Sequence, residues 1–249
     1  MRIHLAAIFL AGSLFGQEFE VATVKSSNPR DGVDMQVSPG GRLTITGFYL
    51  SQLIEKAYGV ENYQISGGPV WASQDRFSIV ATPRESSPLS KFSPAKRRDP
   101  PPPEELLMLQ ALLANRFHLK LHHETKEGAV YVLKVGAKGP RLQPPKNPEN
   151  PPRVGVGFDS DGDGSRVHYL YGLNATASAL VKQLARALHR PVADETGLAA
   201  NFDFKVSYDQ DEIGASLITA IQQLGLKLES RKGPIEILVI DHAEKPSAN

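Results

Sequence analysis

The chain carries one hydrophobic pattern twice, and this apparent repeat limits its fold more than any other feature. In the first copy the apolar blocks are, in order, GGRLTITGFYLSQLIEKAYG, YQISGG, RFSIVA, LLMLQALLANRFHLKLHHE and AVYVLKVG. In the second they are GSRVHYLYGLNATASALVKQLARALHRPVADETGL, NFDFKVS, SLITAIQQLGLKLES and IEILVID. Matching blocks in matching order predict two tandem modules. The polar residues differ between the copies, which indicates a repeated binding scaffold rather than a repeated catalytic site.

Strand and helix patterns follow one another within the first copy. Apolar residues alternate over residues 19–24 and 43–47, which predicts two strands. Helical spacing follows over residues 50–57, and Gly59 lies just past the expected helix end. A second helix is expected to begin at Pro103, with glutamates in its first turn.

The second copy repeats this order. A leucine stripe over residues 180–188 predicts a helix that Pro191 ends, and residues 217–224 predict another. Each second helix leads into an alternating strand and a hairpin partner, with Lys232 and Gly233 in the expected turn of the second copy. The order strand, helix, strand, strand, helix, hairpin predicts an α+β fold with small mixed sheets and helices on one face.

The N-terminus has the pattern of an export signal. Arg2 precedes an apolar stretch over residues 5–15, and Gly16 precedes the first polar residues. This stretch is shorter than the ~20 residues of a membrane span, so we expect a signal peptide over 1–16 and no membrane span after its cleavage. The chain contains no cysteine, which excludes disulfides, a thiol nucleophile and a cysteine lipid anchor. We therefore expect a periplasmic or secreted protein.

Proline and charge divide the remaining chain. Thirteen of the 19 prolines lie within 83–103 and 140–152. The expected organisation is a first module over 17–143 with a disordered insertion at about 84–103, a linker over 144–162, and a second module over 163–249. The formal net charge is +1, from 28 basic and 27 acidic residues, which argues against nucleic acid as a partner.

A group of histidines is the first candidate for chemistry. His118, His122, His123 and Glu124 could form a zinc site if they lay on a helix. The alternation of apolar residues around His118 instead predicts a strand, which would place His118 and His122 about 13 Å apart at ~3.3 Å per residue. We therefore favour an exposed polar strand face and predict no metal site.

An acidic turn is the second candidate. Asp159, Asp161, Asp163 and Gly164 resemble the first half of a calcium loop. The twelfth position of such a loop, which should be glutamate, is Leu170. The oxygen ligands are therefore incomplete, and we favour an acidic turn that opens the second copy.

Two further motifs have structural and functional interpretations. Trp71 follows the turn Gly67 to Pro69 and could anchor a peptide, but such a turn more often delivers a tryptophan to the core. The basic residues 96–98 could form a docking motif, but a solvated loop is the interpretation we favour. Neither motif predicts a specific ligand.

Polar residues of the second copy also lack a catalytic arrangement. Asp194 and Glu195 are adjacent and would point apart on a strand, so they form a poor acid and base pair. Asn174 or Thr176 is expected to cap the following helix rather than to carry a glycan. We predict no catalytic, cofactor-binding or metal-binding residues.

Several blocks resemble known families. FEVATVK, LSQLIEKAYGV, YQISGGPVW, LLANRFHLKLHHETKE and LGLKLESRKGPIEILVIDHAEKP together resemble a soil-associated bacterial family of exported proteins with a domain of unknown function. This resemblance implies export and assigns no functional residue. LARALHRPVADETGL, SLITAIQQLGLKLES and IEILVID are similar to the short N-terminal modules of secretins and TonB-dependent receptors, which are periplasmic interaction domains.

These observations favour a non-enzymatic envelope protein that binds a protein or peptide partner in signalling or assembly. Strand addition at a free sheet edge is the expected mechanism. A metal-dependent enzyme or hydrolase of the envelope is the alternative, and a small-molecule sensor is the second alternative.

Overall fold

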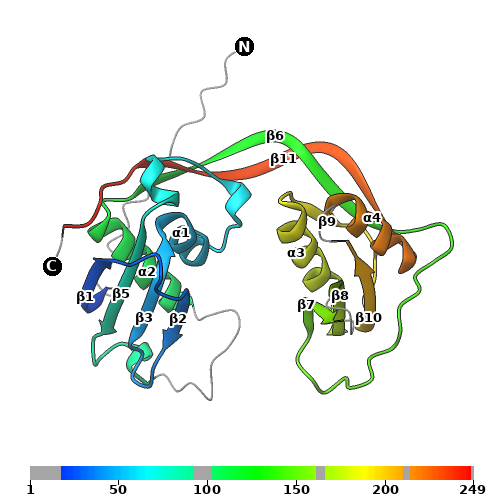
Figure 1. The fold of residues 1–249 in the computed structure, drawn as a ribbon, viewed down its shortest axis with the longest axis horizontal. Coiled ribbons are helices and arrows are strands. Elements are labelled where there is room, and N and C mark those ends of the chain that lie inside the picture. Colours follow the sequence, from blue (N-terminus) through cyan, green and yellow to red (C-terminus); the bar gives the residue numbers. More distant parts are fainter. Residues whose placement is uncertain (1–17, 92–102, 161–165, 210–212, 248–249) are drawn as a thin grey trace, which may run out of the picture. The chain divides into compact units, whose positions relative to one another are not determined.

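The computed structural model describes residues 18–91, 103–160, 166–209 and 213–247. The expected signal peptide, the basic residues 96–98, and Asp161, Asp163 and Gly164 lie outside these ranges. The described chain is of mixed α and β type, with four α-helices and several small sheets (Figure 1). It divides into two compact units, Met1–His123 with Leu238–Asn249, and Glu124–Ile237.

The first unit contains an antiparallel sheet whose strand order is β1-β5-β3-β2. Its strands are β1 (Phe19–Ser26), β2 (Asp34–Val37), β3 (Leu43–Tyr49) and β5 (Arg76–Pro83). Buried and partly exposed residues alternate along β5, so one face of the sheet packs on the core. Helices α1 (Leu50–Tyr58) and α2 (Pro103–Arg116) contribute Leu53, Ile54 and Leu113 to that core. Helix α1 ends as predicted, at Gly59 with a φ of 66°.

Short elements complete the first unit. They are the 3₁₀ helices η1 (Asn62–Gln64), η2 (Val70–Ser73) and η3 (Pro88–Lys91), and strand β4 (Ile65–Gly67). Part of the predicted disordered insertion is therefore ordered, because η3 places Leu89 in a buried position. Residues 92–102 of that insertion lie outside the described chain.

The second unit contains an antiparallel sheet with the order β10-β8-β7. Its strands are β7 (Arg153–Ser160), β8 (Arg166–Ala175) and β10 (Phe202–Tyr208), and its helices are α3 (Ala177–Leu188) and α4 (Ile213–Gln223). Leu170, Leu184 and Ile221 are fully buried between the sheet and the helices. The predicted linker 144–162 thus includes a strand, because the alternating Val154, Val156 and Phe158 pair β7 with β8.

A third sheet has the order β4-β11-β6-β9, with β6 (Lys120–Val135), β9 (Val192–Asp194) and β11 (Leu226–His242). Both predicted hairpins are single long strands instead. Lys232 and Gly233 lie inside β11 and form no turn. A Cβ on Gly233 would lie 3.1 Å from the Val130 side chain, and a Cβ on Gly128 would lie 2.5 Å from Ile235. These glycines make room for side chains of the neighbouring strand.

Candidate functional site

The predicted histidine cluster lies in and beside β6, with ion pairs to β11 and the residues after it. The Nδ1 atom of His122 lies 2.8 Å from a carboxylate oxygen of Asp241, and that of His118 lies 3.3 Å from Glu244. Hydrogen bonding to His242, with a smaller contribution from the charge of His118, lowers the pKa of Glu244. Within the described ranges there is no group of three or more His, Asp or Glu side chains that could hold a metal ion. His118 and His122 instead form exposed ion pairs with these carboxylates.

The acidic candidates are also bound to separate partners. Asp159 accepts a hydrogen bond from Lys205 at 2.8 Å, and Leu170 is a core residue. Asp194 accepts a hydrogen bond from the backbone N–H of Thr196. Glu195, which follows β9, pairs with Arg231 of β11 at 2.7 Å. The structure does not bring these carboxylates together at one site.

Trp71 belongs to the core side of the first unit. Its ring stacks on Phe117, with centroids 6.4 Å apart, and meets Phe77 edge to face at 6.0 Å. Gly67 and Gly68 adopt positive φ, where Ile240 of β11 packs against them. The turn therefore delivers Trp71 to the core, as favoured from the sequence.

The two residues considered as helix caps have different roles. The hydroxyl of Thr176 accepts a hydrogen bond from the backbone N–H of Ala179 and caps α3, as predicted for this position. Asn174 is buried and binds the carbonyl oxygens of Pro148 and Asn150. Asn174 thus holds the segment that leads into β7.

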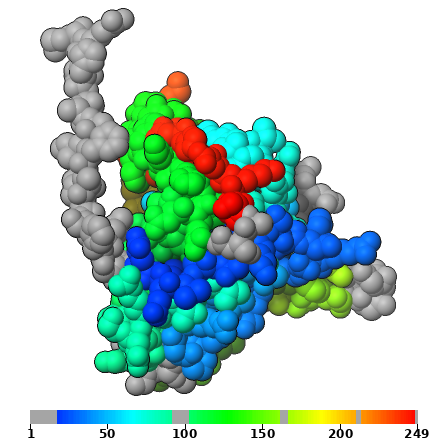
Figure 2. All heavy atoms as spheres, turned by 90° about the vertical axis from the view of Figure 1, so that its left-hand side faces the viewer, coloured from blue at the N-terminus to red at the C-terminus, as the bar shows by residue number. Residues whose placement is uncertain are grey.

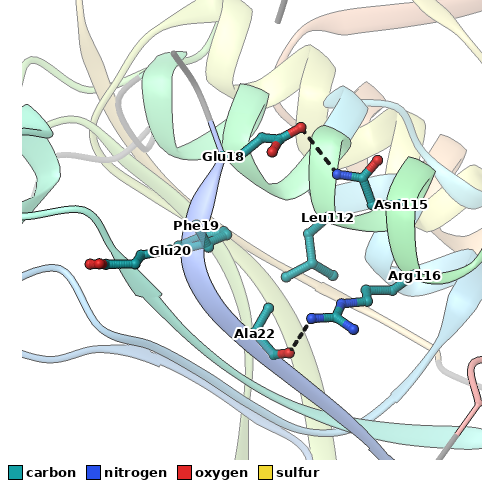
Figure 3. A pocket seen from close by; sticks show the side chains of 7 residues that line it. All are labelled: Glu18, Phe19, Glu20, Ala22, Leu112, Asn115 and Arg116. Carbon is teal, nitrogen blue, oxygen red and sulfur yellow. Dashed lines mark hydrogen bonds between the residues drawn. The ribbon is translucent and has the colours of Figure 1, made fainter. Parts of the chain in front are cut away.

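The most informative arrangement for binding is the packing of β1 in the first unit. Strand β1 pairs with β5 and lies against α2, where Arg116 donates a hydrogen bond of 2.7 Å to the carbonyl oxygen of Ala22 (Figure 3). Asn115 of α2 donates to Glu18 at 3.2 Å. In the space-filling view the dark-blue residues of β1 lie directly beside the green part of the chain, which includes α2 and β6 (Figure 2). Strand β1 therefore covers an edge of the sheet that β5 would otherwise leave open.

The corresponding edge of the second sheet is open over most of its length. Strand β10 is the last strand of the order β10-β8-β7, just as β5 would be without β1. Among the described residues, Gln143 alone bridges this edge, through two backbone hydrogen bonds with Asp203 of 3.1 and 2.8 Å. Alternate residues of a strand direct their backbone groups to the same side. The N–H and C=O groups of Lys205 and Ser207 therefore point to this open edge.

Helix α4 lines a hollow of about 400 Å³ beside the open edge. It is bordered by residues of β10 and α4: Ser207, Tyr208, Asp209, Ala215, Ser216, Thr219 and Gln223. The Ser216 hydroxyl binds both backbone groups of Asp209 and fixes the end of β10. Burial raises the pKa of the Tyr208 hydroxyl. The hollow thus lies between the end of β10 and a polar face of α4.

Helices α2 and α4 end in the same way. A residue with positive φ follows each helix, His118 at 46° after α2 and Gly225 at 70° after α4. Counting back from these residues places Thr219 where α2 has Leu112, and Gln223 where α2 has Arg116. The two side chains that α2 turns toward β1 therefore have smaller polar counterparts at the open edge. The spacing of Ser216, Thr219 and Gln223 on one helix face was the available sequence signal.

Comparison with known proteins places the chain in a family. A family model described as "Protein of unknown function (DUF3738)" matches residues 51–243. The chain belongs to this family. The DUF3738 match runs from α1 to the residue after β11 and so includes parts of both units. No curated protein and no solved structure matches the chain. None of the described helices is long and apolar enough to span a membrane.

Proposed function

We propose that this protein is an exported, non-enzymatic binding protein of the cell envelope, built by internal duplication as two tandem α+β modules. Its second module would bind an extended segment of a protein or peptide partner as an added strand on β10. One observation carries the proposal: β1 covers the edge of β5 in the first unit, whereas the equivalent edge of β10 is open beside a hollow.

The element order supports the duplication. The first half of the chain contains β2, β3, α1, β4, β5, α2 and β6, and the second contains β7, β8, α3, β9, β10, α4 and β11. The sheet orders β5-β3-β2 and β10-β8-β7 correspond strand by strand. Strand β1 has no complete counterpart in the second half. The pairing of β1 with β5 therefore indicates how an added strand would pair with β10.

Backbone pairing alone would give weak binding. Lys205 and Ser207 can exchange about four hydrogen bonds with an added strand, each contributing about 1 kcal/mol net. The association itself costs at least ~4 kcal/mol in lost translational and rotational freedom. Side chains that fill the hollow along α4 must therefore provide the net affinity. We expect a reversible interaction that depends on both the edge and the hollow.

Selection from displayed peptide libraries tests this function on the purified protein. One library presents peptides with free C-termini and the other presents peptides fused at both ends. We expect enrichment of extended, β-prone sequences from at least one library. If neither library yields a sequence enriched over a control protein, the binding function is refuted.

Two pairs of variants test the site. Ser207→Pro removes the outward N–H and should abolish binding, whereas Ser207→Ala retains that N–H and should bind like the wild type. Thr219→Arg should fill the hollow, whereas Gln222→Arg adds the same charge to an exposed position outside it. Equal binding by Ser207→Pro and Ser207→Ala would exclude strand addition at β10.

The metal-dependent alternative lacks a comparable arrangement among the described residues. The open edge of β10 offers backbone donors and acceptors in a row, which suit a peptide rather than a compact solute. We therefore propose a single function.

A further inference from the structure

The match between β5 and β10 fixes where an added strand would lie. Each strand directs three alternating buried residues into the core of its unit: Phe77, Ile79 and Ala81 in β5, and Phe202, Phe204 and Val206 in β10. Ser78 of β5 therefore corresponds to Asp203 of β10. The partner of Ser78 on β1 is Lys25, and the partner of Asp203 is Gln143. Gln143 thus occupies the place of Lys25.

The neighbouring residue extends this match by one position. Val24 precedes Lys25 and is buried in the core of the first unit. Leu142 precedes Gln143 and packs against the core of the second unit. Residues 142–143 therefore form a short counterpart of the C-terminal part of β1.

The chain leaves this path at the next residue. In β1, Thr23 continues along the sheet and pairs with Val80. Arg141 instead donates its backbone N–H to the carbonyl oxygen of Leu224 at 2.7 Å, after α4. The position opposite Lys205 on this edge is therefore open. Leu142 occupies the next position along the path of β1. A strand that runs in the direction of β1 must therefore end opposite Lys205.

Arg141 is the residue at which the chain leaves the path of β1, directly before Leu142. The Arg141 side chain is exposed and forms no ion pair with another residue of the described chain. We propose that the partner of the β10 edge is the free C-terminus of a protein or peptide. Its last residue would pair with the Lys205 backbone, and its terminal carboxylate would bind the Arg141 guanidinium. This inference rests on the proposed function and specifies its ligand.

The penultimate residue of the ligand would take the place of Ala22. In the first unit the carbonyl oxygen of Ala22 accepts the Arg116 hydrogen bond, and Ala22 packs partly against the core (Figure 3). In the second unit Gln223 would donate to the penultimate carbonyl. The wall of α4 has Thr219 in place of Leu112, so the penultimate side chain can be larger than alanine. The ligand is thus an extended C-terminal tail with a bulky penultimate side chain.

The test compares one selected peptide in three forms, as the free acid, as the C-terminal amide, and with one glycine appended. Isothermal titration with the full mature chain measures each affinity. We expect the free acid to bind at least tenfold more tightly than the amide or the extended peptide. Arg141→Gln should reduce the affinity for the free acid to that for the amide and leave the affinity for the amide unchanged. Lys138→Gln, a nearby exposed change, should alter neither affinity.

The outcomes separate this inference from the function on which it rests. If the acid and the amide bind equally and Ser207→Pro still abolishes binding, strand addition stands and the C-terminal ligand is excluded. If a peptide binds but is insensitive to both Ser207→Pro and Arg141→Gln, the β10 site and the C-terminal ligand are both excluded. Preference for the free acid that persists in Arg141→Gln would also overturn the assignment of Arg141.

Discussion

Substitution of Asn174 should lower the free energy of unfolding more than substitution of any other polar residue of the second unit. Its side chain is 5% exposed, and its backbone has a φ of 48°. The side-chain amide donates to the carbonyl oxygens of Pro148 and Asn150 at 2.9 and 2.6 Å, and its oxygen accepts from Asn201 at 2.9 Å. One residue therefore joins the segment before β7 to the residue before β10.

Two substitutions distinguish the contribution of the Asn174 side chain to stability from that of its backbone conformation. Asn174→Gly removes three hydrogen bonds but keeps a residue that tolerates positive φ. At about 1 kcal/mol per bond this loss lowers the free energy of unfolding by about 2 to 3 kcal/mol, because Pro148 and Asn150 are exposed and can bind water. Asn174→Ala adds the strain of the left-handed backbone, about 1 kcal/mol more. Asn201→Ala removes a single bond and should lower the free energy of unfolding by about 1 kcal/mol.

Urea unfolding followed by far-ultraviolet circular dichroism measures these differences, with the slope of the transition checked for each variant. The expected order of stability is wild type, Asn201→Ala, Asn174→Gly and Asn174→Ala. Wild-type stability of Asn174→Gly would refute the hydrogen-bond argument. An alanine variant as stable as the glycine variant would refute the backbone argument.

Three further changes test other parts of the fold. Two lysine ammonium groups hold the pKa of Glu229 at about 2, below its usual 4.5, so its ionised form stabilises the protein above pH 4.5 and this contribution is lost as the pH falls through 2. Urea midpoints should therefore differ between wild type and Glu229→Gln at pH 7 and converge near pH 2. Phe117→Ala removes a fully buried ring and should cost about 3 to 5 kcal/mol, with a red shift of Trp71 fluorescence before unfolding; a smaller loss than 1 kcal/mol would contradict the stacking. Gly225→Ala should destabilise more than Gly59→Ala in thermal melts, because both have positive φ but only the former would place a Cβ 2.0 Å from a carbonyl oxygen.

The local elements were predictable because local residues determine them. The apolar stripe before Gly59 and the prolines at positions 103 and 191 mark the beginnings and ends of helices. The predicted hairpins were wrong. A glycine such as Gly233 is typical of a turn, but here it makes room for the side chain of Val130, which is distant in the sequence. Periodicity reports which face of a strand is buried, but it does not report how far a strand continues.

Only the class of the candidate site, a free strand edge, was predictable from the sequence. Free strand edges follow from small mixed sheets, but the edge of β10 is open because residues 139–141 turn away after β6. That departure depends on contacts with Leu224, which lies 83 positions after Arg141. The sequence contains the small polar residues of α4, but only their position beside β10 relates them to a ligand.

The pairing of the long strands explains why the compact units do not follow the proposed halves of the chain. Strand β4 belongs to the first half, yet its parallel partner is the stretch Leu238–Ile240 at the end of the second. Strand β9 belongs to the second half, and its parallel partner is Tyr131–Leu133 in the strand that ends the first. A chain division within 144–162 would separate β9 from β6 and β4 from β11. Each of the proposed halves therefore supplies a strand to the other unit. The open edge of β10 likewise depends on residues from both proposed halves.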